Sequence, residues 1–499
     1  MVRKSTVREH RSQQRSNDQK GLRHVELGSA TGSQAQSVWK HIPLWGSYAL
    51  LVYMPFHIFL SQWLSTFTGG LEAWKIAKDV ITLALVVVSL GLVLWTGAYK
   101  QRVFIWAAGL SVAYVALHII TYAINQDTTP EVAALATVYN NRLLWYLIIG
   151  LSAWLLTPKS FTINKITKLV LIVSTITAGL GVLQYFAPAN IMTYFGYSLD
   201  RGVWPAFFID SKPDLPRIMS TVRDPNSYGA YLILPLTLLW TLLLQSLKVK
   251  SKKYKAQVSK LKSPVSSINY HLSTMSSATL LLSGLFMLHG LALFLTFSRS
   301  AWIGAFVSLV IVSLVAERRF MKQWFKRLWP FVTAAIFVLA FGILMLRDTY
   351  VVQNIIFHAD DSTTAEMDSN ALHIHAPLEG LRQAGQKPQG YGPGTAGIVS
   401  IQNESGSFLT ENYYIQILHE VGIAGLAVFG AALLFVVRQL RVESKLGAAL
   451  FASFWGYFLM SMIMHLWTNE AVAAQWWLAA GLLIGAQMAA NEHKPKRQN

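Results

Sequence analysis

The sequence has 499 residues, of which 53% are hydrophobic and only 13% are charged. A soluble domain carries about a quarter charged residues, so this chain has too few to cover a water-facing surface. The composition therefore excludes a soluble enzyme and a DNA-binding domain, and the net charge of +18 needs another explanation. The chain contains no cysteine, which excludes disulfides, thiolate metal sites and cysteine nucleophiles.

Apolar blocks of roughly 17–25 residues recur along the chain, and each is long enough to cross the hydrocarbon core of a bilayer. They predict an all-α, polytopic integral membrane protein with about twelve transmembrane helices. The predicted spans are 43–66, 79–98, 103–124, 142–157, 168–187, 227–247, 277–297, 301–316, 328–346, 414–437, 447–466 and 473–490.

These spans divide the chain into five regions. The expected regions are a disordered basic cytoplasmic arm at 1–41, spans 1–9 with an outer loop (188–226) at 42–346, a large extracytoplasmic loop at 347–412, spans 10–12 at 413–490 and a cytoplasmic tail at 491–499. The long loop is rich in Gly, Ser and Asp, which is typical of a mobile lid that orders on binding.

Lysine and arginine are concentrated in alternate segments, among them the arm, the loop 248–276 and the loop 438–446. By the positive-inside rule these segments are cytoplasmic, which places both termini inside the cell and the long loop outside the cytoplasmic membrane. The lysine run between Lys248 and Lys262 then sets topology and can contact anionic lipid. We therefore expect the lipid bilayer, and no nucleic acid, as its partner.

Two arginines stand at the predicted outer membrane edge. Arg223 precedes the sixth span in Ser-Thr-Val-Arg-Asp-Pro-Asn, and Arg299 lies in the short outer turn before the eighth, in Phe-Ser-Arg-Ser-Ala. A charge at such a position usually faces a polar cavity or a partner, and a guanidinium suits phosphate oxygens. The alternatives are a local ion pair, such as Arg223 with Asp224, or contact with lipid head groups. Asp224-Pro225 also predicts a helix N-cap followed by proline in the first turn.

The long loop contains a glycine-rich motif, Gly390-Tyr391-Gly392-Pro393-Gly394, which allows a tight turn and close approach of a ligand. Glu411 and Asn412 follow at the outer mouth of the tenth span. Glu420 lies more than two helical turns further, so we expect it to pack inside the bundle, because a carboxylate facing lipid is costly.

In this order, these motifs resemble the O-antigen ligase and polymerase superfamily, whose polytopic enzymes transfer glycans from undecaprenyl diphosphate on the outer leaflet. The resemblance covers about 215–437. It rests on Arg223-x-Pro225-Asn226, Ser298-Arg299-Ser300-Ala301, Pro388–Gly394, Asn412-Tyr413-Tyr414 and Glu420–Leu426.

The resemblance implies that Arg223 and Arg299 bind the pyrophosphate, and we expect Tyr391 and Gly392 to contact it as well. The partners it implies are an undecaprenyl-diphosphate-linked glycan and a glycan, lipid or protein acceptor. It implies neither a metal nor a cofactor. His373-x-His375 and the nearby acidic residues (Asp360, Asp361, Glu366 and Asp368) can be read as a metal site, but an acidic, water-exposed loop explains them more simply.

In ligases of this superfamily a histidine precedes the Asn-x-Tyr pattern and is the proposed base. Here that position is Glu411, which can still accept a proton. The predicted catalytic residues are therefore Glu411, then His373 or His375, with Asn412 beside them. Because a ligase and a polymerase differ only in their acceptor, both remain open, as does a non-catalytic flippase or transporter.

Other polar and aromatic residues in the spans have structural interpretations. We expect the four histidines in or near spans (His57, His118, His289 and His465) to pack or to bond a neighbouring helix. Most tryptophans, Trp476 and Trp477 among them, are expected to anchor the membrane interface. Two glycine pairs, Gly179/Gly181 and Gly481/Gly485, are typical of close helix contacts.

Overall fold

A computed structural model describes residues 38–158, 163–209, 212–258, 277–316, 345, 349, 369–403 and 406–492. Ten helices in these residues are long and apolar enough to cross a membrane, which confirms an all-α, polytopic membrane protein. The predicted eleventh span corresponds to a shorter helix of 16 residues. The predicted ninth span (328–346), the arm before residue 38 and the tail after residue 492 lie outside the described residues, except for Met345.

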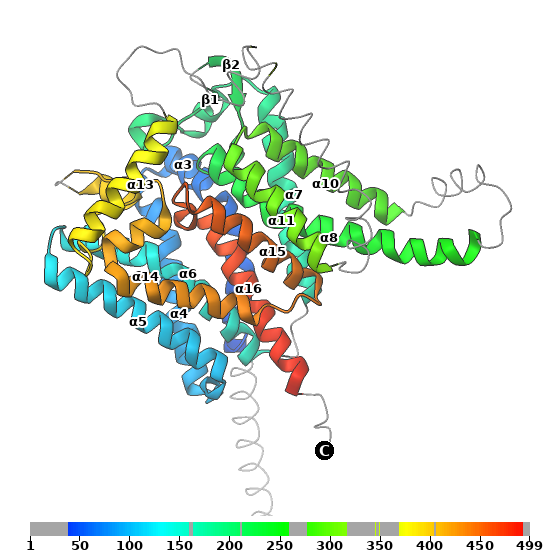
Figure 1. Ribbon diagram of the computed structural model, residues 1–499, viewed down its shortest axis with the longest axis horizontal. Coiled ribbons are helices and arrows are strands. Elements are labelled where there is room, and N and C mark those ends of the chain that lie inside the picture. Colours follow the sequence, from blue (N-terminus) through cyan, green and yellow to red (C-terminus); the bar gives the residue numbers. More distant parts are fainter. Residues whose placement is uncertain are drawn as a thin grey trace, which may run out of the picture.

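The helices form one bundle (Figure 1). In chain order they are α2 (Ile42–Tyr53), η1 (Met54–Phe56), α3 (His57–Thr68), α4 (Leu71–Trp95), η2 (Ala98–Lys100), α5 (Arg102–Asn125), α6 (Pro130–Leu156), α7 (Ile163–Phe186), η3 (Ile191–Phe195), η4 (Leu199–Arg201), α8 (Pro225–Val258), α10 (Ser277–Leu295), α11 (Arg299–Ala316), α13 (Ser369–Gln386), η6 (Ile398–Gln402), α14 (Tyr413–Gln439), α15 (Lys445–Met460), η7 (Leu466–Thr468) and α16 (Glu470–Glu492).

Two helices begin well before the spans that the sequence predicted. The second span was expected from residue 79, but α4 starts at Leu71; the fourth was expected from residue 142, but α6 starts at Pro130. Thr129 caps α6 by accepting a hydrogen bond from the Val132 N–H. The predicted boundaries were wrong because they followed hydropathy and stopped at charged residues, whereas backbone hydrogen bonding continues through them.

The last span, α16, lies at the centre of the bundle. It packs on α6 at glycines: a Cβ on Gly481 would come within 2.5 Å of the Leu147 carbonyl oxygen. Gly485 lies equally close to Trp154, which confirms the predicted contact of this glycine pair. Trp476 and Trp477 are fully buried. Their predicted role as interfacial anchors is wrong, because α16 is surrounded by protein.

The other predicted glycine pair is confirmed only in part. A Cβ on Gly181 would come within 2.7 Å of the Tyr228 hydroxyl, so α7 and α8 approach closely there. Gly179 has open space around its Cβ position.

The connections predicted to share one side of the membrane do meet on one face. We call it the loop face; it comprises residues 126–129, 218–224, 296–298, 387–403 and 461–469. Asn125 Nδ2 donates to the Gly390 carbonyl (2.9 Å), and Asn412 Nδ2 donates to the Met462 carbonyl (2.8 Å).

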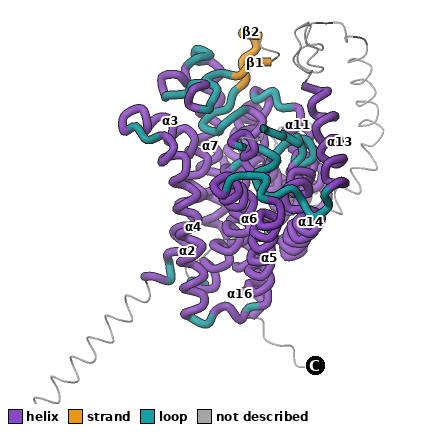
Figure 2. Tube along the Cα trace, turned by 90° about the vertical axis from the view of Figure 1, so that its left-hand side faces the viewer, coloured by secondary structure: helices purple, strands orange, loops and turns teal. Residues whose placement is uncertain are grey.

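A short hairpin, β1 (Phe207–Ile209) and β2 (Lys212–Arg217), lies at the loop-face end of the molecule. The C-terminal end of α16 lies at the opposite end (Figure 2). Its two strands pair antiparallel, with Phe207 opposite Arg217.

Candidate functional site

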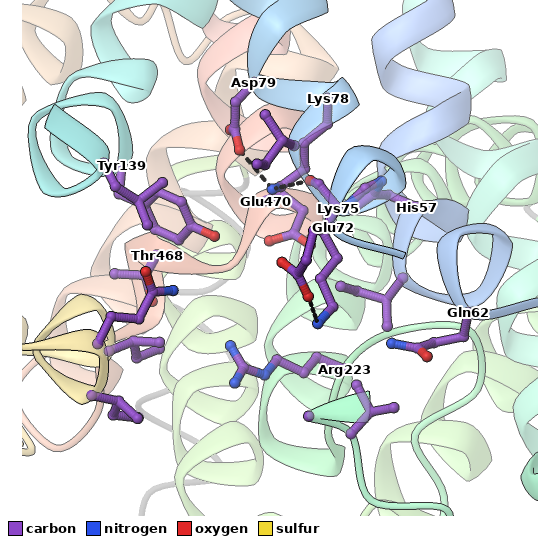
Figure 3. A pocket seen from close by; sticks show the side chains of 18 residues that line it. His57, Gln62, Glu72, Lys75, Lys78, Asp79, Tyr139, Arg223, Thr468 and Glu470 are labelled. Carbon is purple, nitrogen blue, oxygen red and sulfur yellow. Dashed lines mark hydrogen bonds and ion pairs between the residues drawn. The ribbon is translucent and has the colours of Figure 1, made fainter. Parts of the chain in front are cut away.

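A cavity of about 480 Å³ opens at the loop face. Its wall combines α3 and α4 with the turn before α8, η6 and the start of α16 (Figure 3). Charged side chains of both signs line it: Glu72, Lys75, Lys78, Asp79, Arg223 and Glu470. Such a concentration of charge in a concave space is typical of a site for a polar ligand.

Arg223 is exposed and lines this cavity. It forms no hydrogen bond or ion pair with any other residue that the structure describes. Asp224, the predicted local partner, instead caps α8: its Oδ1 accepts from the Ser227 N–H (2.9 Å) and its Oδ2 from the Ser227 hydroxyl (2.6 Å). The predicted N-cap is confirmed, and the local ion pair is not formed. Arg223 is thus available to a ligand in the cavity.

Arg299 lies elsewhere on the loop face. It is the first residue of α11, is half-buried and is not among the residues that line the cavity. Arg217, which the sequence analysis did not single out, donates to the Thr296 carbonyl (2.9 Å) and to Asn226 Oδ1 (2.8 Å). Arg217 therefore links the hairpin to the turn before α11 and, through Asn226 of the Arg-x-Pro-Asn motif, to the start of α8.

A buried network of charges forms the floor of the cavity. Lys78 Nζ lies 2.8 Å from Asp79 Oδ2, and Arg142 Nη1 lies 3.5 Å from Asp79 Oδ1. Arg142 Nη2 lies 3.9 Å from Glu470 Oε2, and the guanidinium stacks over Tyr139 at 4.3 Å. Buried charges are retained when they are paired in this way, since each unpaired one is costly to desolvate.

The sequence analysis missed this network because it placed these residues at span ends or beyond them. The helix start signals were present: Thr129-Pro130-Glu131 is a capping residue, an N1 proline and a first-turn acid. A helix starting there carries Arg142 well inside the bundle, and a charge inside a membrane bundle needs a partner.

The glycine-rich loop packs against a kink in α14. Gly422 interrupts that helix with φ +72°, and a Cβ there would lie 2.4 Å from the Gln389 carbonyl carbon. The freed carbonyls of the kink accept from the loop: the Tyr391 N–H donates to His419 O (2.8 Å) and the Gly392 N–H to Glu420 O (2.9 Å). The loop therefore serves as the hydrogen-bond partner of a broken helix.

Glu420 is fully buried, as predicted. Its carboxylate accepts from Asn140 Nδ2 (2.8 Å) and from the Gly394 N–H (2.9 Å). It joins α6, α14 and the glycine-rich loop. Tyr391 stacks on the His419 ring with 4.5 Å between centroids. Neither Tyr391 nor Gly392 lines the cavity, so the structure does not bring them together with Arg223.

The predicted catalytic residues lie around the start of α14 and on α13. Asn412 is the N-cap of α14, and its Oδ1 accepts from two backbone N–H groups. Glu411 precedes it with φ +48°. The predicted mobile loop contains a helix here, α13, which the sequence analysis did not anticipate. His375 on this helix is exposed, and His373 belongs to its first half, with its side chain outside the described residues.

All four histidines in or near the predicted spans bond, as expected, through a ring nitrogen to another helix or loop. His118 Nε2 lies 3.1 Å from Asn140, and His289 Nε2 lies 3.0 Å from Ser174. His465 Nε2 lies 3.1 Å from the Thr410 hydroxyl. His57 bonds Tyr53 through Nδ1 (2.9 Å), but its buried Nε2, at the cavity, has no hydrogen-bond partner among the described residues.

His465 gives the loop face a measurable pH dependence. Burial lowers the pKa of His465 to about 4, against a smaller opposing effect of Glu411. Below pH about 6.5 the unfolded chain binds a proton that the folded chain does not, so stability falls with pH between about 6.5 and 4. This fall in the free energy of unfolding should be up to about 3 kcal/mol smaller in His465→Gln, which has no imidazole to protonate. Thermal unfolding at pH 4.5 and 7.5 measures it, and equal pH slopes in both proteins would contradict it.

The family model described as O-antigen ligase matches residues 284–430. This part of the chain is similar to the O-antigen ligase family. The O-antigen ligase match runs from α10 into α14, so it includes Arg299, the glycine-rich motif, Glu411 and Glu420. Arg223 and the α4 side of the cavity lie before it. No curated protein matches the chain.

In the matched segment and the rest of the described chain, no group of three His, Asp or Glu residues is placed to hold a metal ion. The acidic residues considered as metal ligands, Asp360, Asp361, Glu366 and Asp368, lie outside the described residues.

Proposed function

We propose that the protein is a membrane glycosyltransferase that moves a glycan from undecaprenyl diphosphate to an acceptor hydroxyl, with its loop face outside the cytoplasmic membrane. One observation carries this proposal: the exposed Arg223 lines a charged cavity without a partner among the described residues. A guanidinium in such a place suits the oxygens of a diphosphate. The family match supports the same class of reaction.

An apolar groove beside the cavity supports a lipid-linked donor. It has a volume of about 570 Å³ and runs between α3 and α7. Phe59 and Leu60 line it on one side and Leu183 on the other, and Thr221 comes from the turn that carries Arg223. A polyprenyl chain in this groove would place its diphosphate near that turn.

In the proposed reaction, the acceptor oxygen attacks the anomeric carbon as its bond to the phosphate oxygen breaks. Arg223, and Arg299 at the start of α11, would offset the charge that grows on the leaving diphosphate. The hydroxyl proton would pass to Glu411, or to His373 or His375, with Asn412 fixing the start of α14 beside them. Attack and departure in one step would invert the anomeric configuration.

The test is transfer by the purified full chain in detergent, with a synthetic undecaprenyl-diphosphate oligosaccharide and a panel of acceptors, followed by mass spectrometry. We expect Arg223→Ala to lower the rate about 10²–10³-fold, as loss of one donor to a developing oxyanion does. Arg382→Ala, which removes a surface arginine from α13, is the matched control.

Glycan on an added acceptor would establish a ligase, and elongated lipid-linked glycan would establish a polymerase. Unchanged donor after the whole panel would contradict catalysis and favour a flippase. Full activity of Arg223→Ala would contradict the role of the cavity.

A further inference from the structure

Two lysines of α4 line the cavity beside Arg223. Lys75 reaches in from α4, and Arg223 from the turn before α8, so two separate elements bring cations to one space (Figure 3). Lys78 lies one helical turn beyond Lys75, at the floor. None of the three belongs to the segment that the family model matches.

Lys75 is held by a partner that it can exchange. Its Nζ lies 2.8 Å from Glu72 Oε1, and the two side chains are 30% and 76% exposed. An exposed ion pair contributes little stability, about 0–1 kcal/mol. An incoming phosphate can therefore replace the Glu72 carboxylate as the partner of Lys75. The Glu72 side chain then rotates away and is solvated by water.

Lys78 is fixed rather than exchangeable. Its Nζ donates to Asp79 Oδ2 (2.8 Å) and to the Lys75 carbonyl (3.0 Å), which uses two of its three protons. Arg142 lies behind Asp79 and also faces Glu470, so these carboxylates are shared between two cations. Lys78 thus keeps one proton for a ligand at the cavity floor.

The cavity also contains a polar atom that lacks a partner. His57 is fully buried, lines the cavity, and has no hydrogen-bond partner at Nε2 among the described residues. Such an atom is costly unless a ligand or water satisfies it. It indicates, independently of the lysines, that the cavity takes a polar ligand.

We propose that Lys75 and Lys78 bind one phosphate of a diphosphate whose other phosphate is bound by Arg223. This inference rests on the proposed function for the identity of the ligand as a lipid-linked diphosphate. The inference adds three residues to the proposed site. Lys75 exchanges Glu72 for phosphate, and Lys78 donates a hydrogen bond from the cavity floor. Arg142 is a positioning residue that keeps Asp79 paired.

Binding can be measured without transfer. The full chain in detergent is titrated with inorganic pyrophosphate and, separately, with undecaprenyl diphosphate. We expect Lys75→Gln and Lys78→Gln each to raise the Kd about tenfold, the effect of one charge-assisted hydrogen bond of about 1.5 kcal/mol. Glu72→Gln is expected to lower the Kd, because it frees Lys75 without removing a cation.

Matched controls come from α13. Arg382 and Glu379 form an ion pair with the same i,i+3 spacing, and neither lines the cavity. Arg382→Gln and Glu379→Gln should leave both Kd values unchanged. The unfolding temperature of each variant shows whether it is folded. If Lys78→Gln does not fold, the half-buried Lys75→Gln variant alone decides the test.

Wild-type affinity in Lys75→Gln would overturn the proposal, as would weaker binding in Glu72→Gln. An equal response to bilayers of phosphatidylglycerol would show a general anionic-lipid surface and overturn it as well. If lysine-dependent binding occurs but no acceptor receives glycan, the binding site stands and the proposed function fails. If transfer requires Arg223 while both lysine variants bind normally, the function stands and this inference fails.

Discussion

Replacing Arg142 by leucine is expected to destabilise the protein by about 3–5 kcal/mol, the cost of leaving buried charge without its partner. Arg142 is fully buried, and Asp79 and Glu470 both face its guanidinium. Without it, two buried carboxylates share one lysine, Lys78. We expect a large fall in the unfolding temperature, which the many tryptophans of this chain report in detergent.

The double variant Arg142→Leu, Glu470→Gln separates charge from packing. It removes the arginine together with one carboxylate and leaves Lys78 paired with Asp79, so it should recover part of the lost stability. An unfolding temperature of Arg142→Leu equal to that of the wild type would contradict the network. A double variant no more stable than the single one would show that the loss comes from packing around Tyr139, over which Arg142 stacks.

That the chain consists of membrane-spanning helices could be predicted from the sequence because hydropathy is a local property. The apolar run of α5 alone shows a span without knowledge of its neighbours. The position of Glu420 was predictable for the same reason, since its distance from the start of α14 follows from helical rise. Asp224 as the cap of α8 was also a local prediction.

What depends on tertiary packing could not be predicted. Trp476 and Trp477 look like interface residues in sequence, and become core residues only because other helices surround α16. Likewise, Lys78 and Glu470 are far apart in sequence and meet only when α4 and α16 pack on α6. Hydropathy placed Lys78 outside a span because a hydropathy scale scores every charged residue as if it had no partner. It therefore misses a charge that is neutralised when the helices pack.

The candidate site shows the same division. Arg223 was predicted from its own motif, and the structure adds the cavity around it. The glycine-rich motif was predicted as a ligand contact, but its N–H groups are directed at the kink of α14. A sequence shows that glycines allow a close approach. It does not show whether a ligand or another part of the chain approaches.

Replacing Glu420, beside the kink of α14, by leucine is expected to cause the second large loss of stability. Leucine leaves Asn140 Nδ2 and the Gly394 N–H without their acceptor, and each stranded buried donor costs about 1–3 kcal/mol. We therefore expect a loss of about 2–6 kcal/mol in the free energy of unfolding, summed from those two donors. The conservative variant Glu420→Gln keeps one acceptor oxygen and should lose less.

Limited proteolysis tests where this loss acts. The Gly394 N–H holds the glycine-rich loop to the Glu420 carboxylate, whereas Asn140 holds α6. If the loop is fixed by Glu420, cleavage within 387–403 should accelerate in Glu420→Leu and much less in Asn140→Ala. The Asn140 variant loses the contacts of α6 with Glu420 and His118 but keeps the bond from the Gly394 N–H to Glu420. Equal acceleration in both would show that the carboxylate stabilises the bundle as a whole. In that case the loop would be held by the backbone bonds of Tyr391 and Gly392 to the kink.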